Sequence, residues 1–404
     1  MSAVDPSSRV LSGMRPTGPL HLGHYHGVLK NWLAMQHEYE CFFFVADWHA
    51  LSTHYEESEH LLQYTLDMVT DWLAAGVNPG SATLFVQSKV PEHAELHLLL
   101  SMITPLPWLE RVPSYKDQQE KLRERDLSSY GFLGYPLLQS ADILAYRAAA
   151  IPVGADLEAH VEMTREIARR FNHLYGREPG FEENAEAAIR KMGRKQGALY
   201  RKLRKAYLEH GDDNAVQTAQ ALLKEQNNLT VGDQERLFGY LEGTGKIILP
   251  EPQALLTPYA KIPGLDGQKM SKSYGNTLSL RESVDDINNK VRKMPTDPAR
   301  IRRNDPGDPG KCPVWQFHQL YSDEQRKQWV LTGCQNASIG CIDCKKPVIE
   351  AIQAELDPIR IEVRELENNQ DVVKNIIAEG CEKARDEAQD TLKEVREAIG
   401  LDYR

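Results

Sequence analysis

Short apolar runs alternate with helical patterns through the first part of the chain, and this alternation restricts the fold more than any other feature. Four runs have the composition of buried strands: residues 10–12, 42–46, 84–87 and 151–153. Between the second and third runs, apolar side chains recur at helical spacing over residues 61–73, and another helical pattern covers residues 161–171. Because a crossover helix joins parallel strands, this segment predicts an α/β fold with a parallel sheet.

The remainder of the chain is predominantly helical. Residues 177–250 are rich in charged and small residues and carry four helical patterns, which predicts an inserted helical module. Amphipathic patterns continue from about residue 279 to the C-terminus. We expect a Rossmann-type catalytic domain in two parts, a helical insertion between them, and a C-terminal all-helical domain. The boundaries are 1–176 and 251–285 for the catalytic parts, 177–250 for the insertion, and 286–404 for the C-terminal domain.

The charge of the chain limits its classes of function. The 404 residues have a formal charge of -10, which argues against a generally basic nucleic-acid-binding surface but not against a local one. A basic group lies in the insertion, either as a solvated helix face or as a contact with an RNA backbone. Its members are Arg190, Lys191, Arg194, Lys195, Arg201, Lys202, Arg204 and Lys205.

Membrane and secretion signals are not apparent in the sequence. No stretch approaches the roughly 20 apolar residues needed to span a bilayer. Residues 1–9 have neither the basic start nor the apolar run of a signal peptide. We therefore expect a cytoplasmic protein.

A glycine-bearing turn follows the first expected strand and leads into a helical pattern. Such a turn presents backbone N–H groups and the positive end of a helix dipole to an anion, and nucleotide phosphates are the natural ligand. His21 and His24 lie on one face of the first helical turn, where they can donate hydrogen bonds to phosphoryl oxygens. Gly23 leaves room for a flat base. Alone, the histidine pair also suits half of a metal site or two solvated side chains.

A second phosphate-binding pattern lies in a glycine-rich loop. It consists of Lys269, Met270, Ser271, Lys272 and Ser273, with Gly264, Gly267 and Gly275 around it. Two ammonium groups in such a loop can neutralise a polyphosphate as it leaves, although a lone lysine pair is usually solvated. Both patterns in this order, separated by half a domain, are hard to obtain by chance.

The two patterns resemble the paired signatures of the class I aminoacyl-tRNA synthetases. Residues 21–24 match the HIGH signature, and residues 269–273 are a full KMSKS signature. The resemblance implies that an amino acid and Mg²⁺-bound ATP form an aminoacyl-adenylate with loss of pyrophosphate, and that the acyl group then moves to the tRNA 3′ end. The catalytic residues implied are His21, His24, Lys116, Lys269 and Lys272.

Other segments resemble the bacterial tryptophanyl-tRNA synthetases: residues 46–51, 134–144, 152–156 and 170–172, in that order. This resemblance implies L-tryptophan, ATP and tRNA(Trp) as substrates, an anticodon-binding role for the helical C-terminal domain, and a homodimer. Asp142 would accept the indole N–H, and its alternative role is the N-cap of a helix. The ATP-binding residues implied are Arg15, Pro16, Thr17, Gly23, His24, Gly154, Ala155, Asp156, Ile262, Lys269, Met270, Ser271, Lys272 and Ser273.

Some of these positions also suit a structural role, and others depart from the family pattern. Asp156 also suits a turn, Ile262 also suits the core, and Lys116 also suits a surface charge. Arg15 and Leu157 stand where the family has glutamine, and Gln118 stands where it has a second lysine. Tyrosyl-tRNA synthetases are the nearest rival, but the full KMSKS and residues 152–154 favour tryptophan. A different HIGH-bearing nucleotidyltransferase or a non-catalytic regulatory paralogue would fit the two signatures and the long helical segment less well.

Four of the six cysteines lie close together in the sequence. They are Cys312, Cys334, Cys341 and Cys344. Four thiolates can close a tetrahedral zinc site or hold a four-iron four-sulfur cluster, and the spacing alone does not choose between them. Four free thiols are a third alternative. A subset of bacterial tryptophanyl-tRNA synthetases has a nearly identical set, which implies a [4Fe–4S] cluster with a structural role. Lys345 and Lys346 beside it suit either RNA phosphates or solvent.

Overall fold

The structure is a computed structural model that describes residues 9–112, 129–154, 157–176, 180–243, 245–256 and 262–403. The chain divides into two compact units. The first contains residues 1–11, 90–256 and 383–404, and the second contains residues 12–89 and 257–382. Among the described residues, no helix is both long and apolar enough to cross a membrane.

A five-stranded sheet has the strand order β3-β2-β1-β4-β5. Its strands are β1 (Arg9–Met14), β2 (Glu40–Val45), β3 (Ala82–Val86), β4 (Ala150–Val153) and β5 (Gln253–Leu256). Strand β2 pairs in parallel with β3, and β4 pairs in parallel with β1 and with β5. The expected α/β class with a parallel sheet is confirmed.

The four predicted strands correspond to β1 through β4, whereas β5 was not predicted. Strand β3 is buried along its whole length and β2 along all but its first residue, which explains their unbroken apolar runs. Strand β5 has only four residues, and Gln253 is exposed while Ala254 and Leu255 are half-buried. So short and mixed a segment shows neither an apolar run nor a clear alternation.

In the first unit, three helices surround the segment expected to bind the amino acid. Helix α8 (Tyr130–Ala145) packs against α5 (Glu92–Ser101) and α9 (Glu158–Tyr175), and the short α6 (Leu106–Glu110) also contacts it. Helix α9 includes the predicted helical pattern at residues 161–171. Ser129 caps the N-terminus of α8 by accepting a hydrogen bond from the Phe132 N–H.

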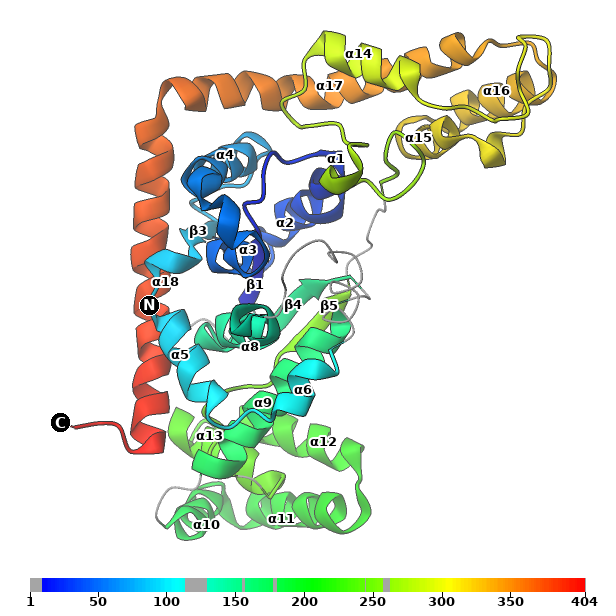
Figure 1. Cartoon of the computed structure of the whole chain (residues 1–404). Coiled ribbons are helices and arrows are strands. Elements are labelled where there is room, and N and C mark those ends of the chain that lie inside the picture. The colour runs from blue at the N-terminus through cyan, green and yellow to red at the C-terminus, as the bar shows by residue number, and fades with distance from the viewer. Residues whose placement is uncertain are drawn as a thin grey trace. The chain divides into compact units, whose positions relative to one another are not determined.

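The insertion forms a helical cluster in the same unit, as expected (Figure 1). Its helices are α10 (Phe181–Lys191), α11 (Gly193–His210), α12 (Asp213–Lys224) and α13 (Val231–Leu241). They bury a common apolar core, and the Tyr200 hydroxyl inside it donates to the Leu237 carbonyl at 2.5 Å. At the base, the Lys246 N–H donates to the Gly176 carbonyl at 2.6 Å, so the chain enters and leaves the module at one point.

The second unit begins with the residues that follow β1. A continuous helical stretch consists of α1 (Leu22–His24), the π-helix η2 (Tyr25–Leu29) and α2 (Lys30–Met35). Farther along come α3 (Asp47–His54), η3 (Tyr55–His60), α4 (Leu61–Ala74) and η4 (Gln87–Lys89). Helix α4 covers the predicted pattern at residues 61–73, and Gly76 follows it with a φ of 106°.

The later part of the second unit is helical, as the amphipathic patterns predict. Its elements are η5 (Lys272–Tyr274), α14 (Val284–Lys293), η6 (Pro309–Lys311), α15 (Pro313–Tyr321), α16 (Glu324–Gln335) and α17 (Cys341–Asn368). Helix α17 lies alongside α14 and also packs on α4 and α15 (Figure 1). The long α18 (Gln370–Ile399) begins in this unit and ends in the first.

Candidate active site

The two predicted phosphate-binding patterns meet in the second unit. His21 and Ser279 form an antiparallel bridge. The Leu22 N–H donates to the Leu278 carbonyl at 3.0 Å, and the Leu280 N–H donates to the Leu20 carbonyl at 3.0 Å. The segment after the glycine-rich loop is therefore hydrogen-bonded to the chain that leads into α1. This juxtaposition explains why two short motifs separated by almost 250 residues act as one site.

His21 and His24 occupy one face of the first helical turn, as predicted, and their rings stack with centroids 3.7 Å apart. The His21 N–H donates to His24 Nδ1 at 3.3 Å. Because Nδ1 is an acceptor in this bond, a neutral His24 carries its proton on Nε2 and can donate from there. The buried Nδ1 of His21 has no hydrogen-bond partner among the described residues.

Both histidines are neutral near pH 7. Burial, and then the positive charge of Lys272, lower the pKa of His21 to about 4. The pKa of His24 is lowered well below its ordinary value by burial, then by His21 and Lys272. Each ring therefore offers one N–H as a hydrogen-bond donor and adds no full positive charge to the site.

Gly23 separates the two histidines for a steric reason. A Cβ at this position would lie 2.9 Å from two atoms of the His21 ring and 3.5 Å from Met270 Cβ. Any larger residue would displace the His21 ring. Glycine thus allows the first motif and Met270 of the second to approach closely.

A buried asparagine holds the glycine-rich loop in shape. Asn276 Oδ1 accepts from the Ser271 N–H at 2.8 Å, and Asn276 Nδ2 donates to Asp266 Oδ1 at 2.8 Å and to the Lys269 carbonyl at 3.1 Å. A Cβ on Gly264 would lie 2.1 Å from Asn276 Nδ2. The sequence motif covers Lys269–Ser273 but does not include Asn276, which follows it by three residues.

Lys269 and Lys272 differ in their surroundings. Lys269 is exposed, whereas Lys272 is half-buried and its Nζ donates to the Gly18 carbonyl at 2.7 Å. Burial, and then the positive charge of Arg15, lower the pKa of Lys272 to about 8. Lys272 is thus held against the first loop and retains its proton near neutral pH.

The first loop borders a hollow on the second unit. Pro16 and Thr17 contribute to a pocket of about 310 Å³, together with residues of α3, η3 and α4. The Thr17 N–H donates to the Arg15 carbonyl at 2.9 Å, which closes a tight turn. The Arg15 side chain is exposed, and its charge reaches Lys272.

Asp142 lies in the first unit and is fully buried in the last turn of α8. The alternative of an N-cap is wrong, because Ser129 caps this helix and Asp142 lies far from its start. Asp142 Oδ1 lies 2.6 Å from His93 Nδ1, and His93 Nε2 lies 2.7 Å from the Tyr146 hydroxyl. This network orients the carboxylate. His93 is not part of any sequence motif, so its contact with Asp142 becomes apparent only from the packing of α5 against α8.

The other predicted nucleotide-binding residues are spread over both units. Gly154 is buried after β4, and its carbonyl accepts from the Leu157 N–H at 2.9 Å. Ile262 is buried, which agrees both with a position in the core and with a position near the adenine. Its carbonyl accepts from the Met270 N–H at 3.4 Å. Lys116, Ala155 and Asp156 lie outside the described residues, as does the side chain of Ser273.

Half of the basic group in the insertion is occupied by contacts within the module. Lys191 pairs with Asp233, Arg201 with Glu186 and Lys205 with Glu209. The guanidinium of Arg204 donates to the Tyr240 carbonyl and lies over the Tyr240 ring. By contrast, three members are exposed and form no ion pair with another described residue: Arg194, Lys195 and Lys202.

The four clustered cysteines are free thiols of intermediate exposure. Burial, followed by the nearby Cys312, Cys334 and Cys341, raises the pKa of Cys344 to about 12, so the four lie within electrostatic range of one another. In the part of the chain that the structure describes, however, no group of three or more histidine, cysteine or acidic side chains is arranged to hold a metal ion. The described geometry therefore does not choose between zinc and a cluster.

The lysines next to these cysteines have different surroundings. Lys345 is buried, and its Nζ donates to the carbonyls of Arg292 and Met294 at 2.7 and 2.6 Å, at the C-terminal end of α14. Both expectations for Lys345, RNA contact and solvation, are wrong. Lys346 is exposed and pairs with Asp343.

Comparisons with known proteins agree on one family. The family model described as tRNA synthetases class I (W and Y) matches residues 5–198 and 217–357. A tryptophan–tRNA ligase from Ralstonia nicotianae is 64% identical over 395 residues, covering 98% of this chain and 99% of the relative. One from Thermotoga maritima is 42% identical, covering 97% and 99%.

Solved structures lead to the same family. A tryptophanyl-tRNA synthetase from Campylobacter jejuni, complexed with ADP and tryptophan, has a TM-score of 0.73 and 28% identity, and the match covers 97% of this chain and 100% of that one. Residues 199–216, which the family model leaves unmatched, run from α11 through the turn after it into the start of α12 in the insertion.

Proposed function

The chain belongs to the class I tRNA synthetases for tryptophan and tyrosine, and from this we propose how its residues divide the work of a tryptophan–tRNA ligase. The ligase activates L-tryptophan with ATP and then charges tRNA(Trp). In the first step a tryptophan carboxylate oxygen attacks the α-phosphorus of ATP, and the bond to the β-phosphate breaks to release pyrophosphate. In the second step the 3′-terminal hydroxyl of the tRNA attacks the acyl carbon, loses its proton, and AMP leaves.

The observation that carries the assignment of residues is the meeting of the two signatures in one unit. His21, His24 and Lys272 lie together there, with two neutral N–H donors and one ammonium group. Negative charge grows on the phosphate oxygens as pyrophosphate leaves, so donors fixed in advance stabilise the transition state more than the ground state. Lys269, Lys116 and the Mg²⁺ carried by ATP would supply further positive charge.

Asp142 would select the amino acid. A buried carboxylate that already accepts from His93 has further lone pairs for an indole N–H. An apolar side chain without that donor would leave the carboxylate unpaired in a buried site, which is costly. Gly154, Ala155, Asp156 and Ile262 would line the nucleotide pocket.

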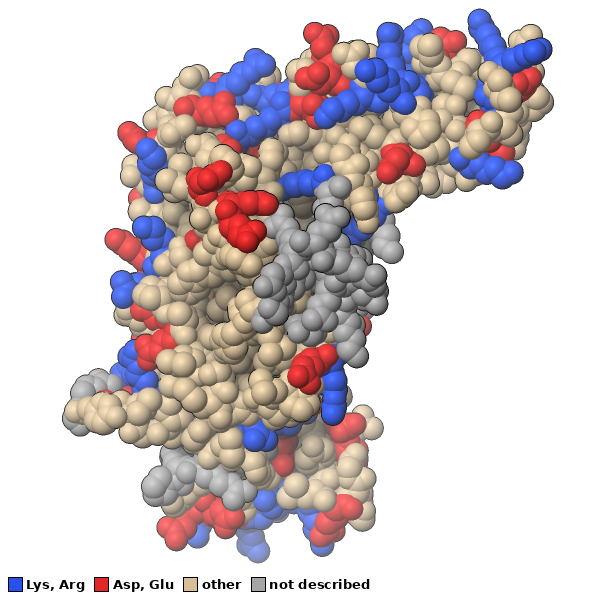
Figure 2. Space-filling view, viewed as in Figure 1, with Lys and Arg blue, Asp and Glu red and all other residues tan. Residues whose placement is uncertain are grey.

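The tRNA would bind through the helical part of the second unit, which we assign as the anticodon-binding domain from residue 286 onward. Lysine and arginine side chains gather over α14 and around α16 (Figure 2). Arg292, Lys293, Arg302, Arg303 and Arg326 are exposed there. Positive charge at this place would bind phosphates locally despite the overall charge of -10. Such a reaction would take place in the cytoplasm.

A homodimer remains part of the proposal. Several large apolar side chains of the first unit are exposed on neighbouring segments: Leu98 and Met102 at the end of α5, Leu106 at the start of α6, and Tyr130 at the start of α8. Their exposed fractions range from 55% to 70%. Exposed apolar surface of this kind is typical of a protein–protein interface.

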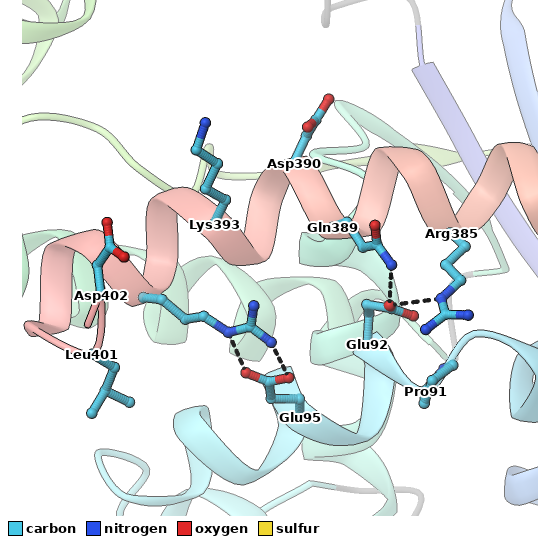
Figure 3. Close-up of a pocket in the computed structure, with 10 residues that line it drawn as sticks. Pro91, Glu92, Glu95, Arg385, Gln389, Asp390, Lys393, Leu401 and Asp402 are labelled. Atoms are coloured by element: carbon cyan, nitrogen blue, oxygen red, sulfur yellow. Dashed lines mark hydrogen bonds and ion pairs between the residues drawn. The ribbon is translucent and has the colours of Figure 1, made fainter. Parts of the chain in front are cut away.

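A second surface feature of the first unit is a polar hollow between α5 and α18 (Figure 3). Glu92 Oε1 accepts from Arg385 Nε and from Gln389 Nε2, each at 2.9 Å, and Glu95 pairs with Arg396. These contacts hold the C-terminal half of α18 against α5. Glu92, Glu95, Arg385 and Arg396 on its rim are therefore engaged with one another, and the proposed reaction uses none of them.

A [4Fe–4S] cluster on Cys312, Cys334, Cys341 and Cys344 is the finer part of the proposal, with zinc as its alternative. It is supported by the donor set, four free thiols within electrostatic range of one another. A cluster here would brace the helices rather than take part in the reaction, since aminoacylation transfers no electrons. Iron and sulfide analysis of anaerobically purified protein, with its visible spectrum, tests this: colourless protein without iron would contradict it.

Direct charging of tRNA tests the proposed function as a whole. The purified chain is mixed with ATP, Mg²⁺, radiolabelled tryptophan and a tRNA(Trp) transcript, and acid-precipitable label is counted. Label should accumulate with tRNA(Trp) and not with a tRNA(Tyr) transcript. No transfer to tRNA(Trp), despite formation of the adenylate, would contradict the second step.

A further inference from the structure

A polar cluster around the buried His26 connects the signature helix to the C-terminal helices within the second unit. It consists of His26 and Lys30 on the helical stretch after His24, Tyr321 at the end of α15, and Glu355 in α17. His26 is 5% exposed. None of the four belongs to a signature motif. Nothing in the proposed reaction accounts for a buried histidine paired with a half-buried carboxylate at this place.

The contacts of Glu355 define the cluster. Its Oε2 accepts from the Tyr321 hydroxyl at 2.7 Å and lies 2.8 Å from His26 Nε2, and its Oε1 accepts from Lys30 Nζ at 2.7 Å. His26 Nε2 also lies 3.1 Å from the Tyr321 hydroxyl. Burial alone would raise the pKa of Glu355, but the hydrogen bonds and charges of its neighbours lower it to about 2. The carboxylate is therefore ionised and bound from three elements at once.

The backbone places this cluster close to the reaction centre. His26 lies two residues after His24, in the π-helix η2 that interrupts the signature helix. π-helical turns are rare and occur often at functional sites, because the extra residue changes the direction of neighbouring side chains. The His26 ring lies edge-on to Tyr321, with centroids 5.7 Å apart, and Lys30 lies 5.2 Å from the centre of the Tyr25 ring. A shift of η2 would therefore move His21 and His24 as well.

We infer that Glu355 and Tyr321 are positioning residues for adenylate formation, which act through His26 on the two signature histidines. This inference rests on the proposed function. Contacts to the phosphates that strengthen only in the transition state depend steeply on position, and a misplacement of about 1 Å can cost about 100-fold in rate. Contacts that bind ground-state tryptophan involve Asp142 on α8, which is not part of the cluster. Loosening the cluster should therefore lower kcat and leave the KM for tryptophan unchanged.

Glu355→Gln tests the inference in the full-length protein. The amide keeps the size of the side chain but removes the charge and one acceptor. In tryptophan-dependent exchange of pyrophosphate into ATP, we expect kcat to fall about tenfold, a part of the loss that a 1 Å misplacement causes. The KM for tryptophan should not change. His26→Gln should have a similar effect, and the double variant should be no slower than either single variant, because the residues act as one unit.

Val363→Ala serves as the matched control for lost stability. Val363 is a buried residue of the same helix α17 and is not part of the cluster. It should lower Tm while kcat stays at the wild-type value. The inference is wrong if Glu355→Gln changes kcat no more than Val363→Ala does at 25 °C. It is also wrong if the KM for tryptophan rises in proportion to the loss of kcat. If the wild-type protein shows no exchange at all, the proposed function has failed instead.

Discussion

Lys272 combines a positive charge with burial, and this combination makes the nucleotide site sensitive to pH. Its pKa is lowered to about 8 by burial and by Arg15, whereas His21, with a pKa of about 4, stays neutral across the neutral range. Near pH 7 the ammonium group is mostly protonated, and as the pH rises through 8 its charge is lost. Transition-state stabilisation that depends on this charge should be lost with it.

The first prediction is a falling limb in the pH profile. The kcat/KM for ATP in pyrophosphate exchange, which reports on the free enzyme, should decline above about pH 8. Arg15→Gln removes one cause of the lowered pKa of Lys272, so the falling limb of this variant's pH profile should move to higher pH. Parallel profiles of the two proteins between pH 6 and pH 10 measure the displacement. A limb at the same pH in both would show that Lys272 does not control it.

The second prediction concerns amino-acid selection by Asp142. Asp142→Asn keeps the shape of the side chain but replaces one acceptor oxygen by a donor. A hydrogen bond to a charged group contributes about 1.5–3 kcal/mol, so kcat/KM for tryptophan should fall roughly 10- to 100-fold. Ser140→Ala, at a buried and hydrogen-bonded position on the same helix, is the control and should have no such effect. Equal values for both variants and the wild type would remove Asp142 from the tryptophan site.

At this scale the sequence identified residues by motif but missed those that support them. His21, His24, Lys272 and Asp142 are predicted from the signature patterns that mark them. His93 and Asn276 were not, since their roles depend on contacts with residues that are distant in sequence or on the shape of a loop. The burial of Lys345 was also unpredictable. From sequence, a lysine between polar neighbours is expected to be exposed, and only the structure shows its carbonyl partners at the end of α14.

At the scale of elements, the glycine-rich loop depends on the fit between Gly264 and Asn276. The third prediction is that Gly264→Ala lowers kcat of pyrophosphate exchange about tenfold or more, since its Cβ would lie 2.1 Å from Asn276 Nδ2 and must displace the loop. Gly232→Ala is the control: a Cβ there meets nothing within 4 Å, and alanine favours helix α13. Unchanged kcat in Gly264→Ala would show that the loop tolerates the displacement.

The insertion enters and leaves the first unit at the hydrogen bond between Gly176 and Lys246. The fourth prediction is that replacing residues 180–243 by a short glycine–serine linker gives a folded protein, because a module with adjacent ends can be removed with little strain. Pyrophosphate exchange should stay within about twofold of wild type. The KM for tRNA should rise, because Arg194, Lys195 and Lys202 are removed.

Two outcomes of this deletion would contradict these expectations. Lost exchange in a folded variant would mean that the module supports adenylate formation. An unchanged KM for tRNA at several salt concentrations would mean that its basic residues form a solvated helix face. The triple variant Arg194→Gln, Lys195→Gln and Lys202→Gln isolates the charge effect from the loss of the module.

The long periodic elements were the most predictable ones. Apolar spacing located α4, α9 and the insertion helices, because each buries one continuous stripe. The π-helix η2 and the four-residue β5 were not predictable. Neither has a repeat long enough to show a period, and β5 depends on its pairing with β4, which lies far from it in the sequence.

At the scale of the whole molecule, the residues assigned to ATP and the residue assigned to the indole of tryptophan belong to different units. His21, His24, Lys269 and Lys272, which would act on ATP, lie in the second unit, and Asp142 lies in the first. Sequence similarity extends over both, because the relative from Ralstonia nicotianae matches 98% of this chain. Sequence patterns mark the ATP-binding and the tryptophan-binding residues separately, since each set has its own motif.

The central claim is that this molecule couples ATP to tryptophan, and amino-acid-dependent exchange of labelled pyrophosphate into ATP tests it most directly. The full-length protein is assayed with tryptophan, with tyrosine and without an amino acid. We predict exchange with tryptophan and only background with tyrosine. Exchange with tyrosine but not with tryptophan would contradict the assignment of Asp142, and no exchange with either would contradict the assignment of an active synthetase site.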